Sequence, residues 1–179
     1  MSDAGDRTTD NLRRAVAALG SPPPGRILGR GHPAGDFLEA YEWELLEERS
    51  GYLRLEAHRP EQVRNPRGQL FGGFTPTYVD LVALLTVRAG QRGEAAGREG
   101  AGREGAGRAR PRSWLATTNM RVDYFDPIVG PRFVIESRLE RRRGRTCFVA
   151  TRFLQGGELA VHALTTMREM PQGKPLGDA

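Results

Sequence analysis

The chain has 179 residues, which suits one ordinary domain that can bury a core without disulfides or bound metal. Its formal charge of +5 favours anionic partners in general but does not select one. The single cysteine, Cys147, excludes an internal disulfide, and no apolar run is long enough to cross a bilayer. Because the N-terminus also lacks the basic start and apolar stretch of a signal peptide, we expect a cytoplasmic protein without a membrane partner.

Residues 1–35 are expected to form a mobile N-terminal arm, either free or packed loosely on the surface of the folded domain. A short helix is predicted within this arm at residues 10–19. The sequence Ser-Pro-Pro-Pro-Gly at residues 21–25 then breaks regular structure. The folded domain is expected to cover residues 36–171, and a C-terminal tail is expected at residues 172–179.

Within the domain, apolar and polar residues alternate in two runs ahead of a helix and in four runs after it. The predicted strands are Tyr41–Leu46, Tyr52–His58, Trp114–Tyr124, Arg132–Arg141, Thr146–Leu154 and Leu159–Arg168. Short glycine-containing turns at residues 143–144 and 156–157 predict hairpins, so this sheet is expected to be antiparallel. In the first strand after the helix, strict alternation places six residues on one face: Trp114, Ala116, Thr118, Met120, Val122 and Tyr124.

The helix is predicted at Thr75–Ala89 and is apolar on nearly every side between Val79 and Val87. A helix without a polar face is expected to be buried nearly all round. One such helix among many strands implies a sheet that curls around it. The predicted fold class is therefore α+β, with an antiparallel sheet wrapped around one long central helix.

A glycine-rich segment at residues 90–112 follows the helix and repeats the sequence Gly-Arg-Glu-Gly-Ala. Nothing in it can build a core and its glycines make ordering costly, so we expect a flexible surface loop inserted into the domain. Two interpretations of this insertion are a low-complexity expansion in a tolerant loop and an RGG-type RNA tether. Because glutamates recur between its glycines, we favour the first and do not expect a nucleic-acid partner.

Asp80 is the only charged residue between Arg67 and Arg88, and it lies in the most apolar helix of the chain. Burying an unpaired carboxylate costs free energy, so the presence of an aspartate in this helix calls for an explanation. The helix dipole near the N-terminus offers a structural reason, and a role as nucleophile or general base offers a functional one. Just ahead of it, Gly72 and Gly73 let the backbone come close to a ligand, and free N–H groups at the helix start can hold an oxyanion.

The spacing of Asn65, Gly68, Phe71-Gly72-Gly73 and Asp80 resembles that of the hotdog-fold acyl-CoA thioesterases, specifically their phenylacetate-pathway (PaaI-like) branch. The resemblance covers residues 41–170 apart from the insertion. It implies a hotdog fold and the hydrolysis of acyl-CoA thioesters to free acid and CoA. It also implies a homodimer whose two chains build the pocket together, and whether two dimers associate into a tetramer stays open.

The resemblance further implies roles for particular residues. Asp80 matches the carboxylate that attacks the thioester carbonyl or activates water, and the N–H of Gly72 matches the group that polarises that carbonyl. Asn65 matches the residue that helps position the thioester or the water, and Thr117 falls where relatives place a hydroxyl that assists the water. The other motif residues, expected to contact substrate, are Gly68, Phe71 and Gly73. No close His/Cys cluster and no His-Glu-x-x-His pattern occurs in the sequence, so we expect neither a metal nor another cofactor.

Phe71 departs from the family, which usually has a histidine before the two glycines. The phenylalanine either fills the space of that histidine, packs in the core, or shapes an apolar pocket for the acyl group. Two functions follow from these alternatives. The first is thioester hydrolysis, and the second is non-catalytic binding of an acyl-CoA or an acyl-carrier protein on the same fold.

Overall fold

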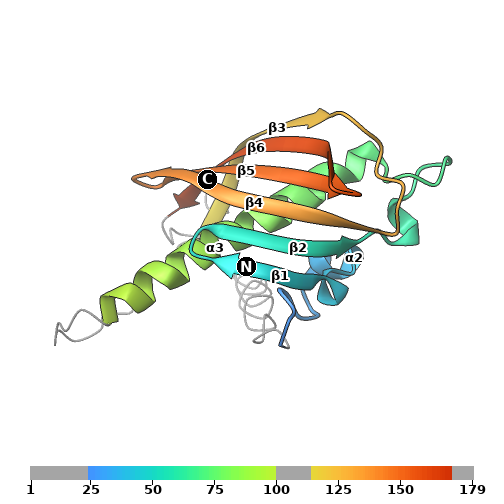
Figure 1. Ribbon diagram of the computed structural model, residues 1–179. Helices are drawn as coiled ribbons and strands as arrows, with labels where there is room; N and C mark the ends of the chain where they lie inside the picture. The colour runs from blue at the N-terminus through green and yellow to red at the C-terminus, as the bar shows by residue number, and fades with distance from the viewer. Residues whose placement is uncertain (1–23, 100–113, 171–179) are drawn as a thin grey trace, which may run out of the picture.

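The computed structural model describes residues 24–99 and 114–170, which form one curved sheet with a long helix against it (Figure 1). Within these ranges, six strands lie in the order β1-β2-β4-β5-β6-β3, and every neighbouring pair is antiparallel. The strands are β1 (Glu44–Arg49), β2 (Tyr52–His58), β3 (Trp114–Tyr124), β4 (Arg132–Arg143), β5 (Thr146–Gln155) and β6 (Glu158–Met170). The prediction of an antiparallel sheet around one central helix is confirmed.

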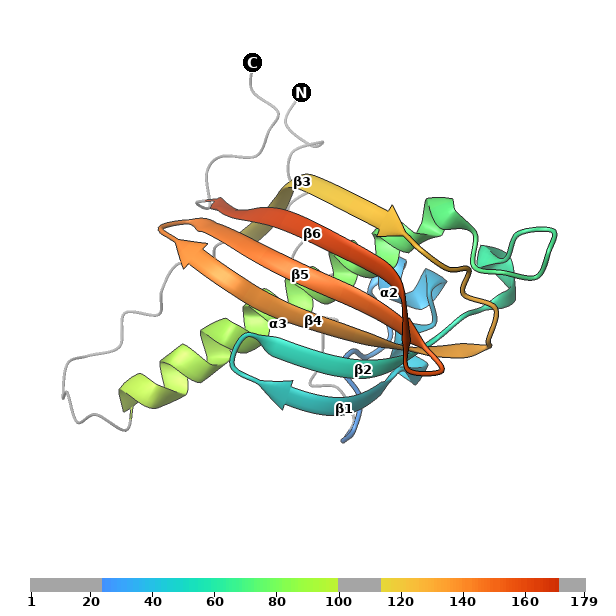
Figure 2. The ribbon, with the colours of Figure 1, turned by 45° about the horizontal axis from the view of Figure 1, so that its top comes forward.

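The central helix α3 (Thr75–Glu99) runs across one face of the sheet, and α2 lies on that same side (Figure 2). The shorter helical segments are α2 (Pro33–Phe37), η1 (Ala40–Glu42), η2 (Glu61–Val63) and η3 (Gly72–Phe74). The core lies between α3 and the sheet, where apolar side chains of the helix meet those of β2, β4 and β5. Tyr78 of α3 stacks on Trp43, with the ring centroids 5.3 Å apart.

One stripe of α3 is less covered than the rest of the helix. Most residues between positions 78 and 90 are buried, but those at a spacing of three or four along one side are exposed or half-buried: Thr77, Asp80, Leu84, Arg88 and Gln91. The prediction that the helix is buried nearly all round is therefore wrong for this stripe. The reason is that the sheet of a single chain covers only the opposite sides of the helix.

The helix is also longer than predicted. It passes residue 89 and continues to Glu99, so the expectation of a surface loop is wrong for residues 90–99. This segment contains alanine, glutamate, glutamine and arginine, which are strong helix formers and extend an existing helix despite the glycines. The remainder of the predicted insertion lies outside the described residues. Neither α3 nor any other helix in the described ranges is long and apolar enough to cross a membrane.

Part of the predicted N-terminal arm packs into the domain. Ile27 and Leu28 are buried in the core, and Arg26 forms a β-bridge with Glu44 at the start of β1. The expectation of a mobile arm is wrong for this part, because two apolar side chains gain burial there. The helix predicted at residues 10–19 lies outside the described residues.

Strand β3 carries a bulge close to its middle. Thr117 pairs with Met167 of β6, and Asn119 pairs with the adjacent Thr166. Thr118 is therefore an extra residue without a partner of its own in this ladder. A bulge of this kind reverses which face each residue occupies on one side of it.

The bulge corrects the predicted faces of β3. Met120 after the bulge packs on the main core, as predicted, but before the bulge it is Leu115 that packs on core residues. The prediction that Trp114, Ala116 and Thr118 share the face of Met120 is therefore wrong. Strict alternation fails here because the ladder contains one residue more than β6 opposes.

The other strands lie close to their predicted positions, and β1 differs most. The predicted strand Tyr41–Leu46 instead begins at Glu44, because residues 40–42 form the turn η1. A left-handed residue, Glu39 with a φ of 53°, introduces this turn. The single cysteine, Cys147, is fully buried in β5.

Candidate active site

A tight loop at residues 64–71, termed the approach loop, leads into the N-terminal end of α3. The side-chain oxygen of Asn65 accepts hydrogen bonds from the backbone N–H of Arg67 at 2.9 Å and of Gln69 at 3.0 Å. The side-chain amide of Asn65 donates to Gln69 Oε1 at 3.1 Å. Gly68 turns the chain in the left-handed region, with a φ of 76°. The geometry thus gives Asn65 and Gly68 a part in shaping the loop itself.

Gly72 begins η3 directly before α3, and a tyrosine from β3 holds its backbone. The hydroxyl of Tyr124 donates to the carbonyl oxygen of Gly72 at 2.8 Å. Among the described residues, no backbone hydrogen bond outside regular elements uses the N–H of Gly72, which is the ordinary state of the first N–H in a helix. That N–H can therefore serve a ligand. Sequence inspection missed Tyr124, because no spacing pattern joins residues so distant in the chain.

Phe71 is half exposed, so core packing does not explain it. The residue is 50% exposed, and its ring meets the ring of Phe74 edge-on, with centroids 5.8 Å apart. Phe74 in turn lies 5.4 Å from Phe37 of α2. A Cβ at Gly73 would come within 2.7 Å of the Phe71 ring, so any residue other than glycine would force this ring to move. Together the three phenylalanines form an aromatic wall next to Gly72.

Asp80 and Thr117 are brought into direct contact. The hydroxyl of Thr117 donates a hydrogen bond to Asp80 Oδ1. Asp80 lies near the start of α3 on the less covered stripe, and it is exposed in the single chain. The prediction of a buried carboxylate is therefore wrong for the chain by itself.

The bulge in β3 explains how Thr117 comes to face the helix. Cross-strand partners project on the same side of a sheet, and the partner of Thr117 is the buried Met167. Without the extra residue, strict alternation from Met120 would turn Thr117 to the outer face. Bulges are common beside active sites because they re-aim a side chain in this way.

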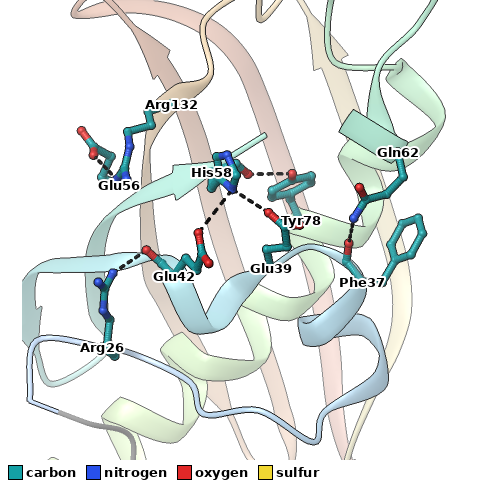
Figure 3. Close-up of polar contacts among 9 residues, drawn as sticks. All are labelled: Arg26, Phe37, Glu39, Glu42, Glu56, His58, Gln62, Tyr78 and Arg132. Atoms are coloured by element: carbon teal, nitrogen blue, oxygen red, sulfur yellow. Dashed lines mark hydrogen bonds and ion pairs between the residues drawn. The ribbon is translucent and has the colours of Figure 1, made fainter. Parts of the chain in front are cut away.

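Figure 3 shows a second polar cluster where β2 ends. Nδ1 of His58 lies 2.8 Å from Glu39 Oε2 and 3.9 Å from Glu42 Oε2. Within the described ranges these three side chains are the one group with metal-ligand geometry, since their ligand atoms all lie within 4.8 Å of one another. Packing where β2 ends brings His58 and Glu39 this close, and the arrangement needs no metal to explain it. Sequence spacing did not reveal the group, because two separate segments supply it.

Tyr78 fixes the backbone at this cluster. Its hydroxyl donates to the carbonyl oxygen of His58 at 2.9 Å, as Figure 3 shows. Burial raises the pKa of Tyr78 above its ordinary value, because the charged phenolate loses hydration in the core. The contact ties α3 to the end of β2, and η2 connects this point to the approach loop.

No protein-family model and no curated protein matches the sequence. Solved structures with a similar fold do exist. A putative thioesterase from Ralstonia eutropha, described as related to phenylacetic acid degradation, gives a TM-score of 0.57 at 21% identity, covering 88% of this chain and 98% of that one. A hypothetical thioesterase from Streptococcus pneumoniae with coenzyme A gives 0.57 at 16% identity, covering 73% and 90%. Thioesterase superfamily member 2 from the mouse gives 0.56 at 17% identity, covering 75% and 86%.

Similarity at such low identity shows a shared fold. The comparison structures cover 88% and 75% of this chain. The chain therefore has the hotdog fold that these thioesterases share, as its sequence predicted.

Proposed function

We propose that this protein hydrolyses acyl-CoA thioesters to free acid and CoA. The observation that carries the proposal is the hydrogen bond from Thr117 to Asp80, at the end of α3 where Gly72 presents a free N–H. Solved neighbours include a hypothetical thioesterase from Streptococcus pneumoniae with coenzyme A and a Streptococcus mutans protein bound to acetyl-CoA. They also include an aspartate-to-alanine and a threonine-to-alanine variant of the pneumococcal thioesterase, the two residue types that meet here.

Each residue then has a defined task in the reaction. The Asp80 carboxylate activates water or attacks the thioester carbonyl directly. The Thr117 hydroxyl orients this carboxylate through its hydrogen bond. The N–H of Gly72 stabilises the oxyanion that forms on the carbonyl oxygen, a contribution worth about 100- to 1,000-fold in kcat in other enzymes. When Asp80 activates water, the water oxygen bonds to the carbonyl carbon, the C–S bond breaks, and one water proton finishes on the sulfur of CoA. When Asp80 attacks directly, the C–S bond breaks as the acyl–Asp80 anhydride forms, and water then cleaves this anhydride to release the acid and restore the carboxylate. Asn65 shapes the approach loop. Gly68 and Phe71 of this loop, with Gly73 of η3, contact the substrate.

The exposure of Asp80 supports a homodimer as the working unit. Asp80 lies on the less covered stripe of α3, and β3 is an edge strand of the sheet. An edge strand offers unpaired backbone groups to a second copy of the chain. Pairing there would extend the sheet past β3 and cover the stripe, which would shield the carboxylate from bulk water.

The first experiment measures CoA release from short, long and aromatic acyl-CoAs by the parent protein and by Asp80→Asn. The substitution keeps the shape of the side chain and removes its charge. We expect turnover of at least one ester by the parent and a loss of about 100-fold or more in the variant. A dimeric, folded parent that releases no CoA from any ester contradicts hydrolysis.

The exposed ring of Phe71 favours a second candidate, a non-catalytic acyl-CoA or acyl-carrier binding protein. Phenylalanine cannot donate or accept the hydrogen bonds that histidine offers at this position of the motif. This candidate predicts saturable binding of an acyl-CoA without release of CoA, measured by calorimetry with the same panel. Turnover that Asp80→Asn abolishes would exclude it.

A further inference from the structure

Arg59 is the most deeply buried charged residue of the described chain. It follows the last residue of β2 and is only 4% exposed. Arginine is rarely so buried, because removing its charge from water costs several kcal/mol unless hydrogen bonds replace the hydration. A buried charge therefore requires hydrogen-bond partners inside the protein. The partners of the Arg59 side chain are backbone carbonyl groups.

Three nitrogen atoms of the Arg59 guanidinium donate to carbonyl oxygens in two different loops. Nη1 donates to the oxygen of Gly68 in the approach loop. Nε and Nη2 donate to the oxygens of Gly130 and Val129, both at 2.8 Å. These two residues belong to the connection between β3 and β4, residues 125–131, termed the β3–β4 loop. The planar fork of arginine suits such an arrangement, since its donors point in fixed directions.

Further hydrogen bonds hold the same two loops together. The backbone N–H of Leu70 donates to the oxygen of Ile128 at 2.8 Å. From the other side, Gln155 Oε1 accepts the N–H of Val129 at 2.7 Å and of Gly130 at 3.1 Å. The carbonyl groups of Val129 and Gly130 are thus hydrogen-bonded to Arg59, and their N–H groups are hydrogen-bonded to Gln155.

The β3–β4 loop begins directly after Tyr124, whose hydroxyl binds the oxygen of Gly72. A closed circuit of contacts therefore runs from Arg59 to Gly68, along the approach loop to Gly72, across to Tyr124, and back through the β3–β4 loop to Arg59. The approach loop leads directly into Gly72, so the position of this loop bears on where Gly72 lies relative to the strand that carries Thr117.

We propose that Arg59 is a positioning residue, which locks the approach loop against the β3–β4 loop and thereby sets the place of the Gly72 N–H in the site. Its catalytic consequence rests on the proposed thioester hydrolysis, whereas the locking of the two loops does not. A purely apolar replacement of similar size would fill the space of the side chain but leave three carbonyl groups unpaired. Lysine would keep the charge but lacks the fork that reaches all three.

The test compares Arg59→Met and Arg59→Lys with the control Arg132→Met. Arg132 is an exposed arginine nearby whose partner is a carboxylate, Glu56, at 2.8 Å. Two readouts are used: hydrogen–deuterium exchange of the approach loop, and kcat and KM measured well below the melting temperature. We expect the backbone amides of Leu70 and Phe71 to exchange faster in both Arg59 variants than in the parent. In the control their exchange should match that of the parent.

For catalysis we expect kcat to fall by about 10- to 100-fold in Arg59→Met, because a misplaced oxyanion donor acts on the transition state. KM should change by less than about threefold, since the substrate contacts themselves remain. In Arg59→Lys we expect a smaller fall in kcat than in Arg59→Met, because the charge is retained. The fall that remains relative to the parent measures the loss of the fork. Unchanged exchange in the approach loop, or a kcat that matches the parent's, overturns the proposal.

A third variant guards against poor folding of the Arg59 variants. Gln155→Met removes the acceptor on the other side of Val129 and Gly130, and it is predicted to loosen the same two loops. If the parent itself has no turnover, the proposed hydrolysis fails, and the exchange measurement still decides whether Arg59 locks the loops. Slow exchange in both Arg59→Lys and Gln155→Met would then refute the locking role.

Discussion

The hydroxyl of Thr117 reaches Asp80, whereas the hydroxyl of the next residue, Thr118, donates to the backbone oxygen of Thr166 at 3.1 Å. Two adjacent threonines therefore occupy opposite faces of the same strand. Only one of them contacts the proposed catalytic carboxylate. This arrangement supplies a matched control for the chemistry of the site.

Thr117→Val removes the hydroxyl and keeps the branched shape of the side chain. We expect kcat for CoA release to fall by about 10-fold, the equivalent of one lost hydrogen bond to a charged group. Thr118→Val should leave kcat within about twofold of the parent, because its hydroxyl lies outside the site. Equal losses in the two variants would argue against a role for the contact between Thr117 and Asp80.

Gly72 permits a test of its N–H alone. Phe71 before it is extended, with φ −69° and ψ 122°, which a following proline requires, and Gly72 is the first residue of η3, where proline is tolerated. Gly72→Pro therefore removes the N–H with little expected strain, and we expect kcat to fall by about 100-fold.

The matched control for this loss is Gly72→Ala, which retains the N–H. A Cβ there would meet the Tyr124 ring at 3.6 Å, an ordinary van der Waals distance. We expect most of the activity to survive in this variant, measured with the same ester. Comparable losses in the alanine and proline variants would show that backbone shape, and not the N–H, is what the site needs.

At the scale of elements, α3 is held to β2 by Tyr78, which stacks on Trp43 and donates to the oxygen of His58. The approach loop departs close to this point. The start of the helix that carries Asp80 is therefore anchored by a buried aromatic residue with a satisfied hydroxyl group.

Tyr78→Phe tests this anchor through stability and its dependence on pH. At neutral pH we expect the free energy of unfolding to fall by about 1–2 kcal/mol, because the part-buried hydrogen bond to the oxygen of His58 is lost. Burial raises the pKa of Tyr78 from its ordinary value of 10.0, so the folded state favours the protonated phenol. The stability linked to this group is present below pH 10.0 and declines as pH rises above it.

The parent should therefore lose more stability than Tyr78→Phe between about pH 9 and pH 11 in urea unfolding. The difference between the two proteins narrows as the pH increases, since the variant lacks the titrating group. Parallel pH profiles for the two proteins would show that Tyr78 ionises as an exposed tyrosine does.

At the scale of the whole molecule, the less covered stripe of α3 and the edge strand β3 lie together around Asp80. The proposed homodimer would close this region. Whether Asp80 and Gly72 of one working site come from the same chain or from two chains can then be tested by mixing variants.

Mixed dimers of Asp80→Asn and Gly72→Pro provide that test. If one site uses Asp80 of one chain and Gly72 of the other, half of randomly assembled dimers are mixed, and each of these has one intact site. We then expect about a quarter of the parent's activity to return after co-refolding of the two inactive variants. No recovery, together with a confirmed mixed dimer by mass spectrometry, would place both groups in the same chain.

The sequence by itself determined the fold class, because periodic burial is a local property of the residues. The apolar helix and the alternating strands specified an antiparallel sheet around one helix, and five of the seven elements begin at their predicted residue: Tyr52, Thr75, Trp114, Arg132 and Thr146. The motif from Asn65 to Asp80 also located the end of α3 where the candidate site lies.

Only the tertiary structure decided how the side chains of the site meet. The bulge at Thr118 arises from pairing with β6, and it turns Thr117 toward Asp80 against the strict alternation of the strand. The contacts of Tyr124 with Gly72 and of Arg59 with two loops join residues distant in the chain, which no local pattern encodes. The exposure of Asp80 was decided in the same way, since the coverage of a helix depends on where the sheet ends.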